Sequence, residues 1–277
     1  NHLSAAAKKK LYAKTGFKRE EISRWRDIVS KMNVVIHDDD FIEQFAGYQG
    51  LSELNWPLYR RKYKDIHRLD RILKAEGDSP DNYKVAKQAD VLMNYYLLSP
   101  EQVTNVLKLM GYAPGAPRVV MKKNYDYYLA RTSHGSTLSY IVHAAILTYL
   151  KAYKKDMWRW FLRGLKSDIY DTQGGTTPEG IHCGVMGGTI EIIVKGFAGV
   201  NLFKNFIRIQ PFLPDHWTEL AFRLTHRGNV FSVYLDREKV RIIKLVESEH
   251  PIAVQVAGER FPLAQGEEKE IPYRKNK

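Results

Sequence analysis

The segment Leu138–Leu150, LSYIVHAAILTYL, contains no lysine, arginine, aspartate or glutamate, and its only histidine is His143. Its composition favours a helix, which we expect over Ser139–Tyr153. A helix on a protein surface carries one polar face, whereas a helix that is apolar all round is buried on both sides. The segment therefore predicts a helix packed between two other layers, as in the inner ring of a two-layer helical barrel.

Most of the chain upstream of this segment is also typical of helices. The segment Tyr83–Leu98 lacks a polar face because two apolar stripes run along nearly opposite sides of it, so we expect it to be doubly buried as well. The expected helices, chosen for helix-forming composition and few internal breakers, cover Glu20–Lys31, Tyr59–Lys74, Lys84–Leu98, Pro100–Leu109 and Val119–Ala130.

After Phe203 the apolar residues recur at every second position, which is the period of a half-buried strand. Turn signals such as Arg227-Gly228-Asn229 separate the runs and predict an antiparallel sheet or a small sandwich. Pro211 and Pro214 interrupt the chain between the two patterns. The boundary therefore lies near residues 203–214, with a helical portion over 1–203 and a β-domain over 204–277.

Composition and charge narrow the class of protein. The chain has 277 residues, of which 44% are hydrophobic and 12% aromatic, and this excludes disordered and low-complexity proteins. Its single cysteine, Cys183, excludes an intrachain disulfide framework. No apolar run approaches the ~20 residues that span a bilayer, so we expect a cytoplasmic protein without membrane contact.

The net charge of +12 favours anionic partners. The basic clusters, such as Lys8-Lys9-Lys10 and Arg60-Arg61-Lys62, are short and scattered along the chain. A nucleic-acid groove needs a continuous basic stripe with interleaved aromatic residues. The scatter favours a solvated surface that binds small anions over a nucleic-acid-binding protein.

A hydroxyl-rich loop, Arg131–Thr137, precedes the charge-free helix. The hydroxyls of Ser136 and Thr137, the backbone of Gly135 and the first amides of the helix could together hold an anion. The alternative is ordinary N-capping by Ser136 or Thr137, and the pattern alone favours capping.

A second loop, Asp171–Thr189, contains six glycines. Thr177-Pro178-Glu179 is a helix-start signal, and the glycines permit close approach of either another helix or a ligand. Neither a P-loop nor a dinucleotide fingerprint is present. His134 and His182 lack metal-ligand spacing with other His or acidic pairs, so we expect no metal site and no cofactor.

Lys87-Gln88-Ala89-Asp90 lies within the predicted helix Lys84–Leu98. A buried lysine needs a partner, so Lys87 either pairs with Asp90 or faces a polar cavity. Taken alone, the ion pair is the favoured alternative.

Taken together, the motifs resemble those of glycoside hydrolase family 65, and the match covers nearly the whole chain. Each motif is weak, but their serial order is specific. The matching motifs are Glu43-Gln44-Phe45-Ala46-Gly47-Tyr48, Lys87-Gln88-Ala89-Asp90, His134-Gly135-Ser136-Thr137-Leu138-Ser139, Thr177-Pro178-Glu179-Gly180-Ile181-His182, Met186-Gly187-Gly188-Thr189, Gly196-Phe197-Ala198-Gly199 and Pro211-Phe212-Leu213-Pro214-Asp215-His216-Trp217.

The resemblance implies a mainly α fold, with part of an (α/α)6 barrel followed by a small antiparallel β-sandwich. It implies inverting phosphorolysis of an α-glucosidic disaccharide to β-glucose 1-phosphate, with inorganic phosphate as co-substrate. The family's general-acid glutamate is expected upstream of Asn1, in an N-terminal part of the same enzyme, so this chain is incomplete by itself. A homodimer is also expected.

The resemblance also assigns roles to residues. Lys87 and Gln88 are expected to reach the glucose hydroxyls, because a polar sugar pocket solvates the ammonium, and this interpretation now replaces the ion pair with Asp90. His134, Gly135, Ser136 and Thr137 are expected to bind phosphate, with His182 as a further contact to phosphate or sugar.

Two alternatives to phosphorolysis remain open. Glu179 would be the catalytic base of an inverting, trehalose-like hydrolase, although an acid at a helix start needs no catalytic explanation. A non-catalytic sugar- or anion-binding module would retain the pocket without turnover. Trp56, Tyr125 and Tyr127 could stack on sugar, although core packing is favoured for most of them. The linkage and the acceptor sugar stay undetermined.

Overall fold

The computed structural model describes residues 3–37, 40–88, 90–150, 154–172, 175 and 177–273. The chain divides into two compact units, and neither is continuous in sequence. The first comprises Asn1–Glu53, Asp81–Lys84 and Ala89–Arg131; the second comprises Leu54–Pro80, Val85–Gln88 and Thr132–Lys277.

The first unit is helical. A buried amide, Asn124, joins its last helix to an upstream extended segment, because its side chain accepts from the Ile42 amide at 2.9 Å and donates to the Asp40 carbonyl at 3.0 Å. The hydroxyl of Tyr128 donates to the Ile42 carbonyl at 2.6 Å. The helices of this unit are α1 (Ala5–Thr15), α2 (Glu20–Lys31), η1 (Tyr48–Gly50), α5 (Asp90–Leu97), α6 (Pro100–Leu109) and α7 (Pro117–Leu129).

Glu43 explains part of the first family-like motif. Its carboxylate is buried, accepts from the amides of Gly47 and Tyr48 at 3.1 and 3.2 Å, and lies 2.7 Å from His37. Gly47 has φ of 89°, in the left-handed region that favours glycine. This motif therefore closes a tight turn in the first unit.

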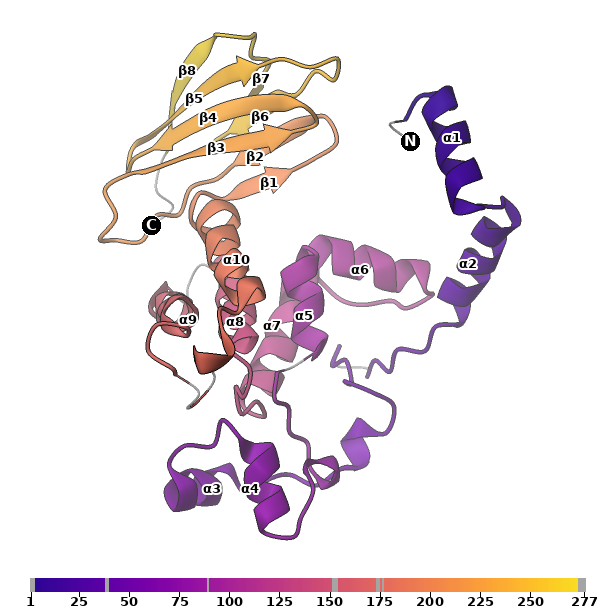
Figure 1. The fold of residues 1–277 in the computed structure, drawn as a ribbon, viewed down its shortest axis with the longest axis vertical. Coiled ribbons are helices and arrows are strands. Elements are labelled where there is room, and N and C mark those ends of the chain that lie inside the picture. Colours follow the sequence, from indigo (N-terminus) through magenta and orange to yellow (C-terminus); the bar gives the residue numbers. More distant parts are fainter. Residues whose placement is uncertain are drawn as a thin grey trace. The chain divides into compact units, whose positions relative to one another are not determined.

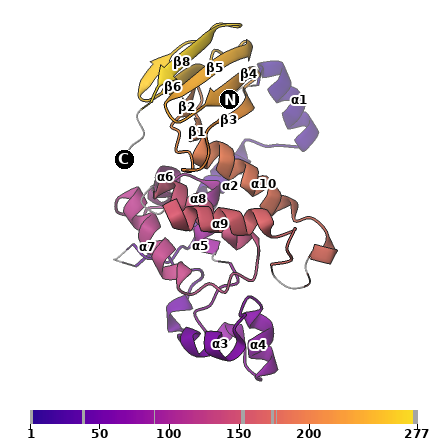
Figure 2. The same cartoon turned by 90° about the vertical axis from the view of Figure 1, so that its left-hand side faces the viewer.

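The second unit places three helices side by side, α8 (Leu138–Tyr149), α9 (Lys154–Lys166) and α10 (Cys183–Glu191), as Figures 1 and 2 show. Gly164 of α9 faces the side chain of Ile141, where an added Cβ would lie 2.3 Å from Ile141 Cδ1. Such contacts let helix axes approach closely. The other helices of this unit are α3 (Trp56–Tyr63), α4 (Leu69–Ala75), η4 (Thr177–Glu179) and the π-helix η5 (Ile192–Phe197); the short helix η2 (Pro80–Asn82) crosses the boundary between the units.

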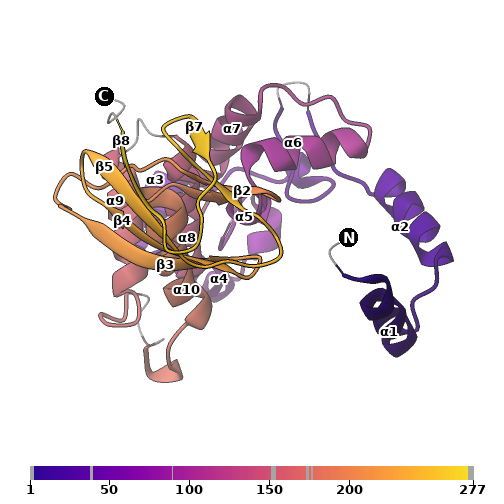
Figure 3. The same cartoon turned by 90° about the horizontal axis from the view of Figure 1, so that it is seen from above.

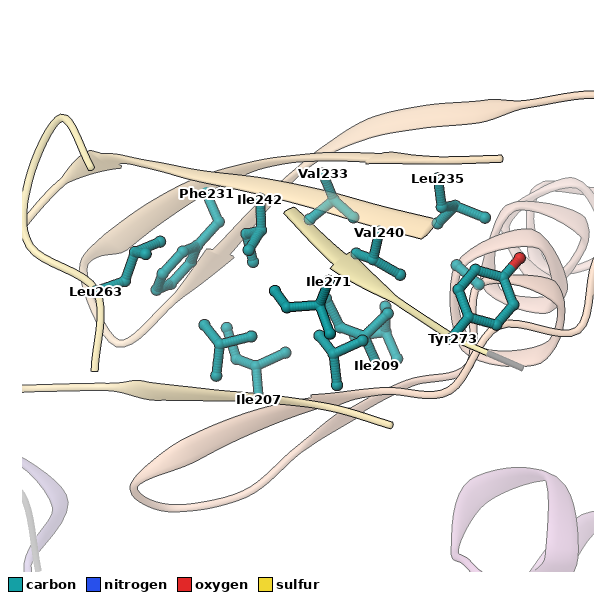
Figure 4. Close-up of a cluster of buried hydrophobic side chains, with 14 of the residues drawn as sticks. Ile207, Ile209, Phe231, Val233, Leu235, Val240, Ile242, Leu263, Ile271 and Tyr273 are labelled. Carbon is teal, nitrogen blue, oxygen red and sulfur yellow. The ribbon is translucent and has the colours of Figure 1, made fainter. Parts of the chain in front are cut away.

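The strands of the second unit form two four-stranded sheets, with orders β1-β2-β6-β7 and β3-β4-β5-β8. Figures 1 and 3 show the two layers, and Figure 4 shows apolar side chains from both pointing toward one another, among them Ile207 and Phe231, both fully buried. The strands are β1 (Val200–Leu202), β2 (Phe206–Ile209), β3 (Leu220–His226), β4 (Asn229–Leu235), β5 (Lys239–Val246), β6 (Ala253–Val256), β7 (Glu259–Phe261) and β8 (Glu268–Pro272).

The expected alternation and turns agree with this sheet pattern. Arg227 and Gly228 have φ of 52° and 81° and connect β3 to β4, as a two-residue hairpin turn requires. The sheet β3-β4-β5-β8 is antiparallel throughout. The other sheet differs from the expectation in one respect, because β2 pairs with β6 in parallel. Alternation shows which face of a strand is buried and carries no information about the direction of its neighbour.

Three expectations for the helices need correction. The helix expected over Tyr59–Lys74 is two helices, because Lys64 adopts φ of 58° and ends α3. The helix expected over Lys84–Leu98 begins only at Asp90. It is also not doubly buried, since the side chain of Leu97 is 71% exposed. By contrast, α8 is buried around most of its circumference, as predicted.

Candidate active site

The loop ahead of α8 pairs with the segment that carries Lys87. Thr132 and Ala86 form a parallel bridge, and the Ser133 amide donates to the Ala86 carbonyl at 2.8 Å. Lys87 and Gln88 follow this bridge directly, outside any helix. The structure thus brings the expected sugar-binding pair and the expected phosphate loop together. The helix Lys84–Leu98 was wrong here because backbone pairing with residues far along the chain replaces the helical hydrogen bonds.

Gly135 is buried at the closest point between the two segments. A Cβ placed on it would lie 2.2 Å from the His67 carbonyl oxygen and 3.0 Å from Lys87 Cγ. The approach to the backbone oxygen of His67 leaves no room for a side chain, and the approach to Lys87 Cγ would require the lysine side chain to shift by a few tenths of an ångström. The absence of a side chain at this position therefore lets the loop lie against the stem of Lys87.

The loop offers several hydrogen-bond donors. Within the described residues, the amides of Gly135, Ser136 and Thr137 donate to no other group. Thr137 is the N-cap of α8, but its hydroxyl makes no capping hydrogen bond, so the capping alternative was wrong. Three amides and two hydroxyls at a helix start are a donor set that suits an anion.

The side chain of His134 anchors the loop to α8 and α9. It has φ of 56°, an uncommon conformation for a non-glycine residue. Its Nδ1 lies 2.9 Å from Ser139 Oγ, and its ring packs 4.6 Å from Trp160 and 4.8 Å from His143, between ring centroids. Burial, assisted by nearby positive charge, lowers the pKa of His134 to about 2, so the ring is neutral. A neutral, packed imidazole supplies no charge to an anion, and its contacts hold the loop in position.

His134 and His143, whose pKa values are both lowered, predict a pH dependence of stability. Burial also lowers the pKa of His143 to about 4, whereas an unfolded histidine titrates near about 6.5. Between these values the unfolded chain binds more protons, so the free energy of unfolding falls as the pH decreases. We expect His143 alone to contribute a slope of up to about 1.4 kcal/mol per pH unit between pH 6.5 and 4.

Urea denaturation of wild type and His143→Gln across this pH range measures that slope. The slope of the free energy of unfolding against pH should be smaller in the variant by the contribution of one titrating group, whatever the variant's stability at pH 7. His250→Gln is the control, because His250 is exposed. Equal slopes for wild type and His143→Gln would contradict a neutral, buried His143.

His182 is held by a carboxylate that sequence reasoning missed. Its Nδ1 lies 2.6 Å from Asp168 Oδ1, and its amide donates to Oδ2 at 2.8 Å. The Asp168 side chain is 9% exposed and the His182 side chain 33%. Because a carboxylate only accepts, this contact requires a proton on Nδ1. Fourteen positions separate the two residues, and no local motif spacing links them.

Two contacts place His182 and the loop at the same end of the helical layer. Gly164, near the end of α9, lies against Ile141, near the start of α8, so these two helices are antiparallel. Gly196, beyond the end of α10, lies against Thr148, near the end of α8, so α8 and α10 run in parallel. The starts of α8 and α10 therefore share one end with Asp168. Within the described residues, no hydrogen bond or ring contact joins His182 to the loop before α8.

The structure describes the remaining candidate residues to different extents. Glu179 lies in η4, and its side chain is outside the described part of the structure. Four described glycines of the second loop have no atom within 4 Å of an added Cβ, so helix packing does not account for them; they are Gly175, Gly180, Gly184 and Gly187. Tyr125 is 3% exposed and belongs to the core.

The other two aromatic candidates are half-buried. The Tyr127 ring lies 3.8 Å from the Arg131 guanidinium carbon, and Arg131 pairs with Glu53 at 2.8 Å. Trp56 begins α3. In the described ranges no group of three His, Cys, Asp or Glu side chains could hold a metal ion, and no helix is long and apolar enough to cross a membrane.

Two family models match the chain. The model of the glycosyl hydrolase family 65 central catalytic domain matches residues 1–191, and that of the family 65 C-terminal domain matches residues 202–263.

Curated relatives cover most of this chain but extend well beyond it. Trehalose 6-phosphate phosphorylase of Lactococcus lactis is 43% identical over 79% of the chain and 28% of its own length. Kojibiose phosphorylase of Thermoanaerobacter brockii is 29% identical over 88% of the chain and 29% of its own length. Maltose phosphorylase of Bacillus subtilis is 29% identical over 91% and 30%. The chain thus spans less than a third of these relatives.

A solved structure shows the same fold. It is a protein from the human microbiome, assigned as a kojibiose phosphorylase, with a TM-score of 0.68 and 23% identity. The similarity covers 95% of this chain and 36% of that one. At this identity the likeness concerns the fold, with helices followed by largely antiparallel sheets.

Proposed function

Because this chain belongs to glycoside hydrolase family 65, we propose that the protein carrying it catalyses phosphorolysis of an α-glucosidic disaccharide. The observation that supports this most directly is the loop Gly135–Thr137. Its three amides donate to no other described group, and Gly135 lies against the side chain of Lys87. Relatives named as phosphorylases of trehalose 6-phosphate, kojibiose and maltose support the same chemistry.

The division of labour follows from the chemistry. Inverting cleavage needs an acid that protonates the leaving oxygen and a nucleophile on the opposite face of the sugar. Phosphate is already a nucleophile, so the protein needs a cradle for it rather than a base. In this proposal Gly135, Ser136 and Thr137 hold phosphate, and Lys87 and Gln88 bind the glucose hydroxyls.

His182 completes the phosphate side of the site. Asp168 fixes a proton on its Nδ1 and so directs Nε2 away from the pair. His134 keeps the loop in place rather than touching the anion. Phosphate oxygen attacks the anomeric carbon, the glycosidic bond breaks, and the acid's proton goes to the leaving oxygen. The products are β-glucose 1-phosphate and the released sugar.

The architecture is part of the proposal. Residues 1–203 would form a portion of an (α/α)6 barrel and residues 204–277 the C-terminal β-domain. The rest of the barrel and the general-acid glutamate would come from the N-terminal part of the same enzyme, whose active form we expect to be a homodimer. No metal or organic cofactor takes part.

The decisive experiment incubates the whole protein with trehalose, maltose, kojibiose and trehalose 6-phosphate, with and without inorganic phosphate. We expect glucose 1-phosphate only when phosphate is present, and NMR of the fresh product should show the β anomer. Equal sugar release in both conditions, without glucose 1-phosphate, would identify a hydrolase and point to Glu179 as its base. Saturable binding without turnover would identify a binding module.

A further inference from the structure

A pocket opens at the start of α9, away from the candidate active site. Its volume is about 190 Å³, and it lies between the first residues of this helix and the segment 212–216, which leads into the β-domain. At a rise of about 1.5 Å per residue α9 is about 20 Å long, and Asp168 follows its other end. The segment belongs to the family-like motif 211–217, which has no part in the proposed reaction.

Hydrogen bonds hold the wall that this segment forms. The Phe212 amide donates to the Phe197 carbonyl at 2.7 Å, and the Trp217 amide donates to the Pro214 carbonyl at 3.0 Å. Arg237, in the turn between β4 and β5, donates from its guanidinium to the Trp217 carbonyl at 3.1 Å. The pocket is therefore preformed, and a ligand would not have to order the chain first.

The interior of the pocket is hydrocarbon and aromatic. Met157, Phe212 and Leu213 are buried, with exposed fractions of 3%, 7% and 4%. Trp158 is half-buried, and its ring centroid lies 4.3 Å from that of His216 in an edge-to-face arrangement. An apolar cavity of about 150 Å³ can hold benzene. This pocket therefore has room for one aromatic ring.

Two lysines give the rim of the pocket a positive charge. Lys154 and Lys155 both line it and are exposed. In the part of the chain that the structure describes, neither lysine forms an ion pair. The Nζ atom of Lys154 lies 5.0 Å from the centroid of the Phe212 ring, so one charge lies directly over the aromatic wall.

Nearby acidic side chains do not neutralise both lysines. Asp156, in the same helical turn, pairs with Arg159 at 3.0 Å. Among the described lining residues, Asp215 is the single carboxylate, against two ammonium groups. The lining as a whole therefore remains positively charged.

An apolar interior and a positive rim match two different parts of one ligand. A ring packed against Met157 and Trp158 is removed from water, which is favourable. A carboxylate or phosphate group at the rim meets the ammonium groups. A neutral sugar fits poorly, because each buried hydroxyl needs a hydrogen-bond partner and hydrocarbon side chains provide none. Inorganic phosphate would leave the interior empty.

We propose that this pocket binds a small organic anion, in which one flat apolar ring carries a single carboxylate or phosphate group. The ring lies between Met157, Trp158 and the segment 212–216, and the anionic group pairs with Lys154 and Lys155. The site goes beyond the proposed phosphorolysis and does not depend on it.

The test is a ligand-observed NMR titration of the whole protein with 4-methylbenzoate. We expect a Kd of about 1 mM or below, the range for a ligand of this size. The neutral 4-methylbenzamide should bind at least about fivefold more weakly because it lacks the charge. Acetate, which lacks the ring, should bind at least about tenfold more weakly. Comparison with 4-methylphenyl phosphate shows whether the site prefers a carboxylate or a phosphate ester.

Variants of the two lysines locate the binding. The double variant Lys154→Gln, Lys155→Gln should weaken binding of 4-methylbenzoate by at least about fivefold and change that of 4-methylbenzamide by less than about twofold. Lys166→Gln is the matched control, because Lys166 is an exposed lysine at the other end of the same helix. It should leave both affinities unchanged. Melting temperatures verify that the variants are folded.

Three results would overturn the proposal. Equal affinity for 4-methylbenzoate and 4-methylbenzamide, or an equal loss in Lys166→Gln, would show that Lys154 and Lys155 do not recognise the anionic group. Acetate binding as tightly as 4-methylbenzoate would reveal a surface anion site that makes no use of the ring. No binding of 4-methylbenzoate or 4-methylphenyl phosphate to the whole protein would mean that the pocket is not a ligand site.

Discussion

Alanine at position 135 should reduce kcat/KM for inorganic phosphate by at least about 100-fold. An added Cβ would lie 2.2 Å from the carbonyl oxygen of His67, a backbone atom that cannot rotate away. The loop must therefore shift, and a shift of its amides removes several hydrogen bonds to the anion together. Each hydrogen bond to a charged group contributes about 1.5–3 kcal/mol, and about 1.4 kcal/mol corresponds to a factor of ten.

Initial rates of sugar phosphate formation at varied phosphate measure this effect in the whole protein. Overpacking also costs about 1–3 kcal/mol of stability, so the melting temperature should decrease while the variant still folds. Gly50→Ala is the matched control, since nothing lies within 4 Å of a Cβ added to Gly50. Wild-type affinity for phosphate in Gly135→Ala would show that this loop does not hold the anion.

Changing Asp168 to asparagine should lower kcat/KM for phosphate by about 10- to 100-fold. The carboxylate holds both the Nδ1 proton and the amide of His182. Asparagine has one acceptor oxygen in place of two, so it satisfies only one of these donors. The imidazole then loses its fixed orientation or adopts the other tautomer. We expect the change mainly in KM for phosphate, with a smaller change in kcat.

The matching His182→Gln variant should lose a similar factor, and the double variant should lose little more, because both changes disrupt one unit. Asp27→Asn serves as the control. It breaks an exposed ion pair with Lys31, which contributes little. Additive effects of Asp168→Asn and His182→Gln would mean that the aspartate acts independently of the histidine.

Local signals were sufficient for many individual elements. The helices α2 and α6 begin and end where composition placed them, and Ser99 with Gln102 forms a capping box at the start of α6. The strand alternation identified both faces of β4, whose Phe231 and Val233 are fully buried while Tyr234 is exposed. Such features depend on residues a few positions apart, and this is why sequence reasoning finds them.

The sequence did not predict the places where backbone contacts with distant residues, or a change of backbone conformation, replace an expected helix. The backbone of Ala86 pairs with Thr132 rather than continuing α5 toward its N-terminus. Lys64 adopts φ of 58° and ends α3 inside a stretch expected to be one helix. Neither feature follows from intrinsic propensity, because tertiary contacts outweigh the fractions of a kcal/mol per residue that propensity supplies.

The candidate site likewise has features that local sequence patterns indicate and features that depend on distant contacts. Local sequence patterns identified the donor-rich loop at Gly135–Thr137, its position ahead of a buried helix, and Lys87 and His182 as candidates. The fold added three contacts that no local pattern indicates. Gly135 lies against the stem of Lys87, Asp168 holds His182, and Arg163 and His134 both lie against the Trp160 ring. The residues in each of these contacts lie far apart in the sequence and meet only when the helices pack. Patterns of neighbouring residues therefore do not predict which side chains come into contact.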